Sequence, residues 1–381
     1  MGIAELTRNA VDVLPEGELE RKLATGRPLR VKFGIDVTAP DVHIGHAIPL
    51  QRMAAFQREG HKGVLIVGDY TTRIGDPSGR SSERPVLSDE EIDRNAQTYL
   101  DQAAKVIDTS PERLEVPFNG EWLGKLDFAE ILRLTRTTTV ARLLERDDFA
   151  KRMAANAPIS VSELLYPLMQ AYDSVAVQAD VELGGTDQLY NLLAGREVME
   201  EYGLEPQVAL TTPLLLGLDG DKMSASKGNY IGLAEPPEEQ FGKAMRISDE
   251  MLPEYYRLVM EQEQPSGDPM EAKLALARFI VRRSHGEEGV RRGEEYFTRV
   301  VRERRPPEEV QEVVHPDPVV HLPAFLAHVL GESSSHWRRV IDQGGVKVDG
   351  RPVDSYDLQT SSIAGAVIQA GKRQFLRIRP A

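Results

Sequence analysis

The sequence lacks cysteine, has only two tryptophans and contains no long hydrophobic run. Without cysteine the chain forms neither disulfides nor thiolate metal sites, and its eight histidines show no metal-ligand cluster such as H-E-x-x-H, so we predict no bound metal. No apolar run approaches the roughly 18 residues of a membrane-spanning helix. The start, MGIAELTRNA, also lacks the basic and apolar regions of a signal peptide. We therefore expect a cytoplasmic protein without membrane attachment.

The length and charge of the chain indicate a folded protein of several domains. Its 381 residues, 41% of them apolar, are enough for two or three compact cores. The formal net charge of -14 argues against a surface coated uniformly for nucleic acid. Residues 318–381 differ, with eight Lys or Arg against five Asp or Glu. This basic tail suggests one small surface that meets a polyanion, although a merely solvated tail explains the charge equally well.

The first 230 residues alternate short apolar runs with longer amphipathic ones. We expect strands at 29–36, 62–69, 112–119 and 207–216, and helices at 45–60 and 89–107. Strands separated by helices of this length favour an α/β fold with a doubly wound, Rossmann-like parallel sheet covered on both faces. Ligands of such a sheet bind beyond the carboxyl ends of its strands.

The pattern then becomes purely helical, through 253–262, 270–286 and 287–304. A Pro-rich, charged stretch at 304–323 is typical of a linker. We therefore divide the chain into an α/β domain at 1–232, a helical domain at 233–316 and a small α+β module at 317–381.

The small module has three local signals. SSSHWRRVIDQGG (333–345) predicts a helix with a serine N-cap and a glycine stop. VKVDGRPV (346–353) predicts a hairpin that turns at Asp349 and Gly350. KRQFLRIRP (372–380) predicts the last strand.

The stretch KFGIDVTAPDVHIGH (32–46) places two histidines at the start of a predicted helix. His43 and His46 are three residues apart, so both side chains fall over the first turn, where free backbone amides favour an anion. Gly45 lets a flat ring or a phosphate come close, and two neutral imidazoles can donate hydrogen bonds to phosphate oxygens. Histidines that merely cap the helix are the alternative.

A loop with the sequence YTTRIGDPSGRSSER (70–84) follows the predicted strand at 62–69. Asp76 can hold a cation, and Arg80 and Arg84 lie where they can fold over a phosphate. The stretch matches neither G-x-x-x-x-G-K-[ST] nor G-x-G-x-x-G, so those nucleotide folds are not indicated. An ordinary strand-to-helix loop with solvated arginines is the alternative.

A third motif lies at 164–193, LLYPLMQAYDSVAVQADVELGGTDQLYNLL. Tyr166, Gln170 and Asp173 are spaced four and three apart, so one helix face carries all three. A carboxylate among apolar neighbours needs a donor, and a ligand hydroxyl would serve, although a surface charge is the alternative. The sequence GGTDQ (184–188) brings backbone close to a ligand, and Asp187 suits ribose hydroxyls.

The fourth motif, DGDKMSASKGNYIG (219–232), holds Lys222 and Lys227 among small residues. It is too polar for a core strand and lacks helical periodicity, which predicts a mobile loop. Either the loop clamps phosphate charge or it is a solvated linker.

Together these motifs resemble the class I aminoacyl-tRNA synthetases, specifically the bacterial tyrosyl type. HIGH (43–46) matches the first class signature without a change, and KMSAS (222–226) matches the second, KMSKS, at four of five positions. The similarity extends to GDPSGR, QAYD and GGTDQ, and the tail resembles the S-four RNA-binding module of bacterial tyrosyl enzymes. The resemblance covers essentially the whole chain.

The resemblance implies a ligase that activates tyrosine with ATP, as its Mg²⁺ complex, and passes the tyrosyl group to the terminal adenosine of tRNA. Its partners would be tyrosine, ATP, tRNA and a second copy of the chain, which makes 1–232 catalytic and 233–316 anticodon-binding. A tryptophanyl-tRNA synthetase, a non-catalytic RNA-binding paralogue and a simple nucleotidyltransferase are the alternatives. Asp173 and the RNA-binding tail disfavour the first. Ala225 supports the second, whereas His43, His46, Asp173 and Asp187 are intact and speak against it. The third would not need the RNA-binding tail.

The resemblance also implies a role for each candidate residue. The groups that act on the phosphates would be His43, His46, Arg80, Arg84, Lys222 and Lys227. ATP binding would add Thr38, Gly45, Gly185, Asp187, Ser224 and Ser226. Tyrosine would be bound by Asp36, Asp76, Tyr166, Gln170, Asp173 and Gln188, with Asp173 accepting the phenol hydrogen bond. RNA would be bound by Arg338, Arg339 and Lys347, with Ser334 beside them.

The chain departs from the family pattern at two positions. Lys32 stands where many tyrosyl enzymes have a tyrosine that helps to bind the substrate hydroxyl, although a second bacterial subtype has lysine there. Ala225 replaces the second signature lysine, and we interpret Lys227 as its substitute. A basic cluster could lie near the acceptor stem or a dimer partner, or could be a solvated helix face: Arg142, Arg146, Lys151 and Arg152.

Overall fold

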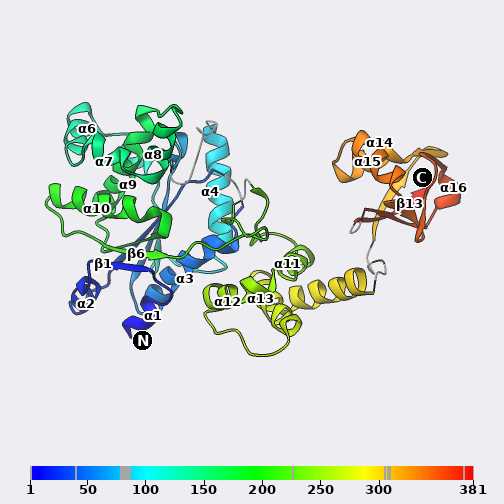
Figure 1. The fold of residues 1–381 in the computed structure, drawn as a ribbon, viewed down its shortest axis with the longest axis horizontal. Helices are drawn as coiled ribbons and strands as arrows, with labels where there is room; N and C mark the ends of the chain where they lie inside the picture. Colours follow the sequence, from blue (N-terminus) through cyan, green and yellow to red (C-terminus); the bar gives the residue numbers. More distant parts are fainter. Residues whose placement is uncertain are drawn as a thin grey trace. The chain divides into compact units, whose positions relative to one another are not determined.

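The computed structural model describes residues 2–38, 41–77, 87–224, 227–303, 306, 310–371 and 374–380. The chain forms two compact units, Met1–Gly289 and Val290–Ala381 (Figure 1). No helix within the described ranges is both long enough and apolar enough to cross a bilayer.

The first unit is built on a six-stranded sheet with the strand order β1-β6-β5-β2-β3-β4. Five strands run parallel: β2 (Arg30–Ile35), β3 (Lys62–Val67), β4 (Leu114–Glu115), β5 (Val181–Gly185) and β6 (Val208–Thr212). The edge strand β1 (Asp12–Leu14) pairs antiparallel with β6. Every residue of β6 is buried, and since successive side chains point to opposite faces, both faces of the sheet are covered. The predicted parallel-sheet fold is confirmed.

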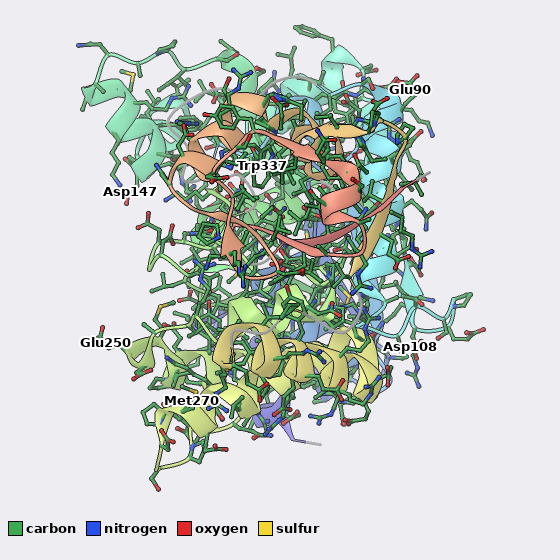
Figure 2. All side chains as sticks on the ribbon, turned by 90° about the vertical axis from the view of Figure 1, so that its right-hand side faces the viewer. Glu90, Asp108, Asp147, Glu250, Met270 and Trp337 are labelled. Atoms are coloured by element: carbon green, nitrogen blue, oxygen red, sulfur yellow. The ribbon has the colours of Figure 1, made fainter. Side chains whose placement is uncertain are left out.

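The covering helices follow the strands in sequence (Figure 1). The longer ones are α3 (Ile44–Arg58), α4 (Asp89–Ala103), α9 (Val161–Val177) and α10 (Leu189–Glu201). Shorter helices are α1 (Ile3–Leu6), α2 (Glu18–Leu23), α5 (Gly120–Leu123), α6 (Phe128–Thr135), α7 (Val140–Leu144) and α8 (Asp147–Ala154). Figure 2 shows Glu90 and Asp108 near opposite ends of α4, which spans much of the unit. The strands and helices expected from the sequence in this part are present, although β4 is only two residues long.

A helical segment completes the first unit. It comprises α11 (Pro237–Ala244), α12 (Leu252–Tyr255), the π-helix η5 (Tyr256–Met260) and the part of α13 (Pro269–Tyr296) up to Gly289. Helix α13 is broken at Gly286, with φ 65° and ψ -167°. Gln51 Nε2 on α3 donates to the Val259 carbonyl at 2.9 Å, and Tyr255 OH donates to the Leu216 carbonyl at 2.6 Å. The segment up to residue 289 thus packs with the α/β core, and its separation as a domain of its own stays a prediction.

The second unit contains a five-stranded sheet with the order β10-β9-β12-β13-β7. Its strands are β7 (Gln311–His315), β9 (Val346–Val348), β10 (Arg351–Pro352), β12 (Val367–Ala370) and β13 (Gln374–Pro380). The helices are α14 (Leu322–Leu330), α15 (Ser334–Asp342) and α16 (Thr360–Ile363), and β8 (Val319–His321) pairs with β11 (Asp357–Gln359). Trp337, labelled in Figure 2, is 2% exposed in a core with Leu326 and Leu376.

The local signals of this unit are confirmed. Ser333 accepts a hydrogen bond from the backbone of His336 and caps α15, and Gly344 follows the helix with φ 69°. The hairpin turns at Asp349 and Gly350, both with positive φ.

The prediction of a linker at 304–323 is wrong for most of that range. Residues 311–315 form β7, which pairs in parallel with β13, and β8 follows at once. The strand contains the alternating residues Val313 and His315, but it lies next to a proline-rich stretch. The composition of that stretch favoured a linker, so the strand pattern was missed. The sheet of the module therefore begins before the predicted boundary at residue 317.

Candidate active site

The two signature histidines lie where α3 begins, beyond the carboxyl end of β2. His43 is the N-cap residue, and the His43 and His46 rings stack with centroids 3.7 Å apart and an interplanar angle of 17°. A Cβ on Gly45 would lie 3.0 Å from His43 Nδ1, tighter than an ordinary contact, so any larger residue would press against the ring. This nitrogen is buried and has no hydrogen-bond partner among the described residues.

The histidines are neutral at physiological pH. Burial lowers the pKa of His46 to about 4, with the nearby Lys222 charge acting in the same direction. Burial, His46 and Lys222 together hold the pKa of His43 well below its usual 6.5. A neutral imidazole donates from one nitrogen and accepts at the other. The arrangement fits hydrogen bonding to phosphate and does not fit a charged clamp.

The loop of the second signature is fastened at both ends. Asn229, 6% exposed, accepts from the Ser224 backbone at 2.9 Å and donates to Asp219 Oδ1 at 2.7 Å. At the far end, Ile44 N donates to the Ile231 carbonyl at 3.0 Å, so the loop pairs with the backbone of the first signature. The sequence predicted a mobile loop here. In the part of the loop that the structure describes, these hydrogen bonds hold it in place.

The two loop lysines have different partners. Lys222 Nζ lies 2.6 Å from Asp187 Oδ2, and Lys227 Nζ lies 2.7 Å from Asp221 Oδ2. Both lysine side chains are about half exposed. Lys222 therefore forms an ion pair with the GGTDQ motif, whereas Lys227 forms one within its own loop. Ala225 and Ser226 lie outside the described residues, as do Arg80 and Arg84.

Beside the histidines, four predicted tyrosine-binding residues form one hydrogen-bonded chain. Tyr166 OH donates to Asp36 Oδ2 at 3.0 Å, and the Asp76 backbone donates to the same oxygen at 3.2 Å. Gln188 Nε2 donates to Asp76 Oδ2 at 2.7 Å. Residues from α9, from η2 (Thr186–Gln188) and from the loops after β2 and β3 thus meet at the carboxyl edge of the sheet, as expected for this fold.

Asp173 is a buried carboxylate further along α9, 3% exposed. Trp122 Nε1 donates to its Oδ1 at 2.8 Å and Asn119 Nδ2 to its Oδ2 at 3.3 Å. Burial raises the pKa of Asp173 to about 7, against the opposing effects of Lys32, Trp122 and Asn119. Sequence reasoning missed Asn119 and Trp122. The only available signal was a rare tryptophan after the predicted strand at 112–119.

Lys32 lies near Asp173 and has no exposed surface. Its Nζ contacts Gln170 O at 2.9 Å, Ser174 Oγ at 2.7 Å and Glu182 Oε1 at 2.9 Å. An ammonium has three donors, and all three are used. Lys32 is therefore not a free donor for a substrate hydroxyl, and Gln170 turns its amide to Glu182 at 3.2 Å.

The remaining ATP-binding candidates lie at the same edge. A Cβ on Gly185 would come within 2.7 Å of Asp187 Oδ1, which explains a glycine at the end of β5. Thr38 follows β2 and its backbone donates to the Asp36 carbonyl at 2.9 Å. No group of acidic or histidine side chains arranged for a metal ion is present in the described part of the chain.

Two predicted basic surfaces differ in character. Arg142 pairs with Glu197 at 2.8 Å and Arg146 with Asp148 at 3.0 Å, and the buried Arg152 with Glu163 at 2.6 Å, so these three have internal partners. Lys151 is exposed. In the second unit, Arg338 and Arg339 are exposed on α15 and Lys347 is half-buried on β9. The tail therefore offers accessible cations, and the first cluster offers few.

Comparison with known proteins identifies the family of the chain. Residues 24–302 match the family model of class I tRNA synthetases (W and Y). The chain is 48% identical, over 391 aligned positions, to a tyrosine–tRNA ligase of Moorella thermoacetica, covering 98% of this chain and 94% of that relative. It is 45% identical over 388 positions to that of Thermotoga maritima, covering 98% and 96%.

Solved structures share the fold. The tyrosyl-tRNA synthetase of Archaeoglobus fulgidus, complexed with L-tyrosine, matches with a TM-score of 0.60 at 23% identity, over 76% of this chain and 97% of that one. The enzyme of Pyrococcus horikoshii, also complexed with L-tyrosine, gives 0.61 at 20% identity, over 78% and 96%.

Proposed function

The chain belongs to the class I tRNA synthetase family of the tryptophan and tyrosine enzymes, and on this premise we propose that it is a tyrosine–tRNA ligase. In the first step the carboxylate of tyrosine attacks the α-phosphorus of ATP, which forms tyrosyl-adenylate and releases pyrophosphate. In the second step a hydroxyl of the 3'-terminal adenosine of tRNA attacks the tyrosyl carbonyl and AMP leaves.

The observation that carries the choice of tyrosine is the buried Asp173 with its two fixed donors. Trp122 and Asn119 occupy one lone pair on each oxygen and orient the carboxylate, and further lone pairs remain for a phenol hydroxyl. An indole side chain offers its N–H at a different position on the ring system. The ammonium of the substrate is assigned to the acceptors Asp36, Asp76 and Tyr166.

Adenylate formation needs positioning and charge stabilisation more than proton transfer, because the attacking carboxylate is already ionised. The neutral His43 and His46 donate to ATP phosphate oxygens, and Lys222 faces the departing pyrophosphate after leaving Asp187. Asp187 is then free to accept from the ribose hydroxyls. Mg²⁺ enters with ATP and neutralises phosphate charge, and no resident metal is proposed.

The test is tyrosine-dependent exchange of pyrophosphate into ATP, followed by charging of tRNA. Exchange with tyrosine and none with tryptophan is expected. Folded protein that supports no exchange with either amino acid would be the non-catalytic paralogue, and exchange with tryptophan alone would overturn the substrate.

We also propose that the partner surface for a second copy lies on helices α6 to α9. Large apolar side chains are exposed to solvent there: Phe128 is 73% exposed, Val140 62% and Val161 72%. Such side chains gather where another protein surface covers them. The cavity between α7, α9 and α10, lined by Leu143, Pro167 and Tyr190 among others, lies in the same region.

For tRNA, we propose that Arg338, Arg339 and Lys347 contact the phosphate backbone, which positions RNA without reading its bases. The helical part of the segment predicted at 233–316, from α11 to α13, is assigned to the anticodon arm. Because ATP and tRNA are both cytoplasmic, the location proposed for the protein is the cytoplasm.

A further inference from the structure

A second cavity in the first unit has a positively charged lining. It encloses about 210 Å³ between α3, the turn after α4, η5 and α13. None of its lining residues belongs to the candidate active site. Arg58, Lys105 and Arg283 contribute positive charge, and Glu261 is the acidic residue among those that line it.

The acidic residue does not balance these cations, because it has other partners. Glu261 pairs with the buried Arg52 and lies 3.8 Å from Arg8. Arg58 lies 3.5 Å from Glu5. The surplus positive charge of the cavity therefore comes from Lys105 and Arg283, in a chain whose net charge is -14.

Arg283 is the innermost of the three. Its Nη2 donates to the Val259 carbonyl at 2.8 Å, and its guanidinium lies over the Phe279 ring, 5.0 Å from the centroid. Its Nη1 is buried without a hydrogen-bond partner in the described part of the chain. The Val259 carbonyl already accepts from Gln51 as well, at 2.9 Å. A buried, unpaired guanidinium donor is costly, and an anion is the group that satisfies it best.

Lys105 and Arg58 extend this positive surface outward. Lys105 Nζ donates to the Leu233 carbonyl at 2.6 Å, which uses one of its three hydrogens. Burial lowers the pKa of Lys105, and it lowers the pKa of Arg283 to about 10, as expected for cations that lack a counter-ion. Arg58 is 48% exposed, so it marks the side of the cavity that solvent reaches.

We propose that this cavity binds a small phosphate-bearing anion, with Arg283 and Lys105 as inner ligands and Arg58 at the mouth. The volume is below the roughly 300–1,000 Å³ of sites for drug-sized ligands, which favours inorganic phosphate or a short phosphate monoester over a nucleotide. An RNA backbone meets exposed cations, whereas Nη1 of Arg283 is buried on a cavity of about 210 Å³, which admits a small anion but not a polymer chain. The site is thus distinct from the tRNA contacts proposed above.

The test measures phosphate binding to the full chain by calorimetry, at constant ionic strength set with sodium chloride. Tyrosine and a non-hydrolysable ATP analogue are kept saturating, so that the active site does not take up phosphate. Saturable binding is expected, and Arg283→Met should weaken it by about tenfold or more, since a hydrogen bond to a charged group is lost. Arg282→Met is the matched control, because Arg282 is the adjacent residue, 47% exposed, and pairs with Glu287.

Arg58→Gln provides a second variant in case Arg283→Met does not fold, since Arg58 is half exposed. It should weaken phosphate binding several-fold and leave the exchange reaction unchanged. Absence of saturable binding to the unsubstituted chain overturns the proposal, and so does equal affinity in all variants. A loss of tRNA affinity in Arg283→Met, without any phosphate binding by the unsubstituted chain, would make the cavity an RNA contact and also overturn it.

Discussion

Lys32 and Glu182 lie opposite each other on the neighbouring parallel strands β2 and β5 and form an ion pair of 2.9 Å with at most 1% of either side chain exposed. Ser174 and Gln207 complete the hydrogen bonds of Glu182, at 3.2 and 2.6 Å. This pair holds a positive charge close to Asp173. All three donors of Lys32 are used within the protein, so we infer that the pair supports the proposed tyrosine pocket without binding the substrate.

Lys32→Met should destabilise the protein strongly, because it leaves Glu182 buried without its counter-charge. Removing one partner of a buried pair costs about 3–5 kcal/mol of unfolding free energy. Urea denaturation measures the loss. The double variant Lys32→Met with Glu182→Gln should recover most of it, and a single variant as stable as the unsubstituted chain would contradict the account.

Asp173→Ala should reduce the preference for tyrosine over phenylalanine. A hydrogen bond to a charged group contributes about 1.5–3 kcal/mol, so the ratio of kcat/KM values should fall roughly 10- to 150-fold. Pyrophosphate exchange with each amino acid gives the ratio. Tyr172→Phe, a neighbouring change on α9, is the control, and an unchanged ratio in Asp173→Ala would place the phenol elsewhere.

Tyrosine activation should depend on the protonation of Asp173. Burial raises the pKa of this carboxyl to about 7, and the ionised form is the better acceptor for a phenol. We expect kcat/KM for tyrosine to rise with pH up to about 7 and then to level off. Asp173→Asn should give a lower and flat profile. His46→Asn should slow the reaction but keep the rise, since the pKa of His46 is about 4.

The same shift has a consequence for stability. In the unfolded chain Asp173 has its ordinary pKa of 3.8, so the folded state binds the proton more tightly. Its contribution to stability is largest below pH 3.8 and is lost as the pH rises towards 7. Comparing unfolding free energies of Asp173→Asn and the unsubstituted chain at pH 5 and pH 8 isolates this contribution.

Lys222→Ala should lower the rate of adenylate formation by about 10²–10³-fold, as expected for loss of a donor to developing charge. Lys227→Ala should have a smaller effect, about tenfold, because Lys227 pairs within its own loop, whereas Lys222 already lies against Asp187 of the GGTDQ motif. Stopped-flow measurement of adenylate formation separates the two. If Lys227→Ala leaves the rate of adenylate formation unchanged, Lys227 does not substitute for the lysine missing at Ala225.

Phe128→Asp should shift a dimer towards monomer, because it places a charge in the apolar surface on α6. Sedimentation velocity over a range of concentrations measures the equilibrium. Glu121→Lys, an exposed change on α5 that precedes this surface, is the control. If the Phe128→Asp protein stays dimeric at every concentration, the interface lies away from these helices.

Much of the fold was predictable, because the main elements carry local signals. The runs around β2 and β3 are apolar and buried, α3 and α4 have clear boundaries, and the turn at Asp349 and Gly350 has the residues that its positive φ values need. β5 was not predicted as a strand because its run ADVELGG is short and polar in part. Glu182 can be buried in this strand only because Lys32 on the next strand neutralises its charge. The local sequence around Glu182 does not reveal this partner.

The residues of the candidate site also divide into those that local sequence predicts and those that it does not. The histidines and the face of α9 follow from spacing within one helix. Asn119 and Trp122 come from a distant turn and reach Asp173 only in the folded chain, so no spacing rule finds them. Arg152 and Glu163 are likewise partners from neighbouring helices, which turned a predicted basic surface into a buried ion pair.

The backbone pairing of His43 with Gly232 bears on how far the chain can be shortened. Ile44 N donates to Ile231 O, Leu233 N donates to Val42 O, and Gln240 on α11 donates to the Gly232 carbonyl at 2.6 Å. A truncated protein ending at residue 232 would keep both signatures yet lose the last two of these hydrogen bonds. A fragment that keeps all three hydrogen bonds around His43 therefore extends through α11, so the start of the helical segment acts as a structural support of the candidate active site.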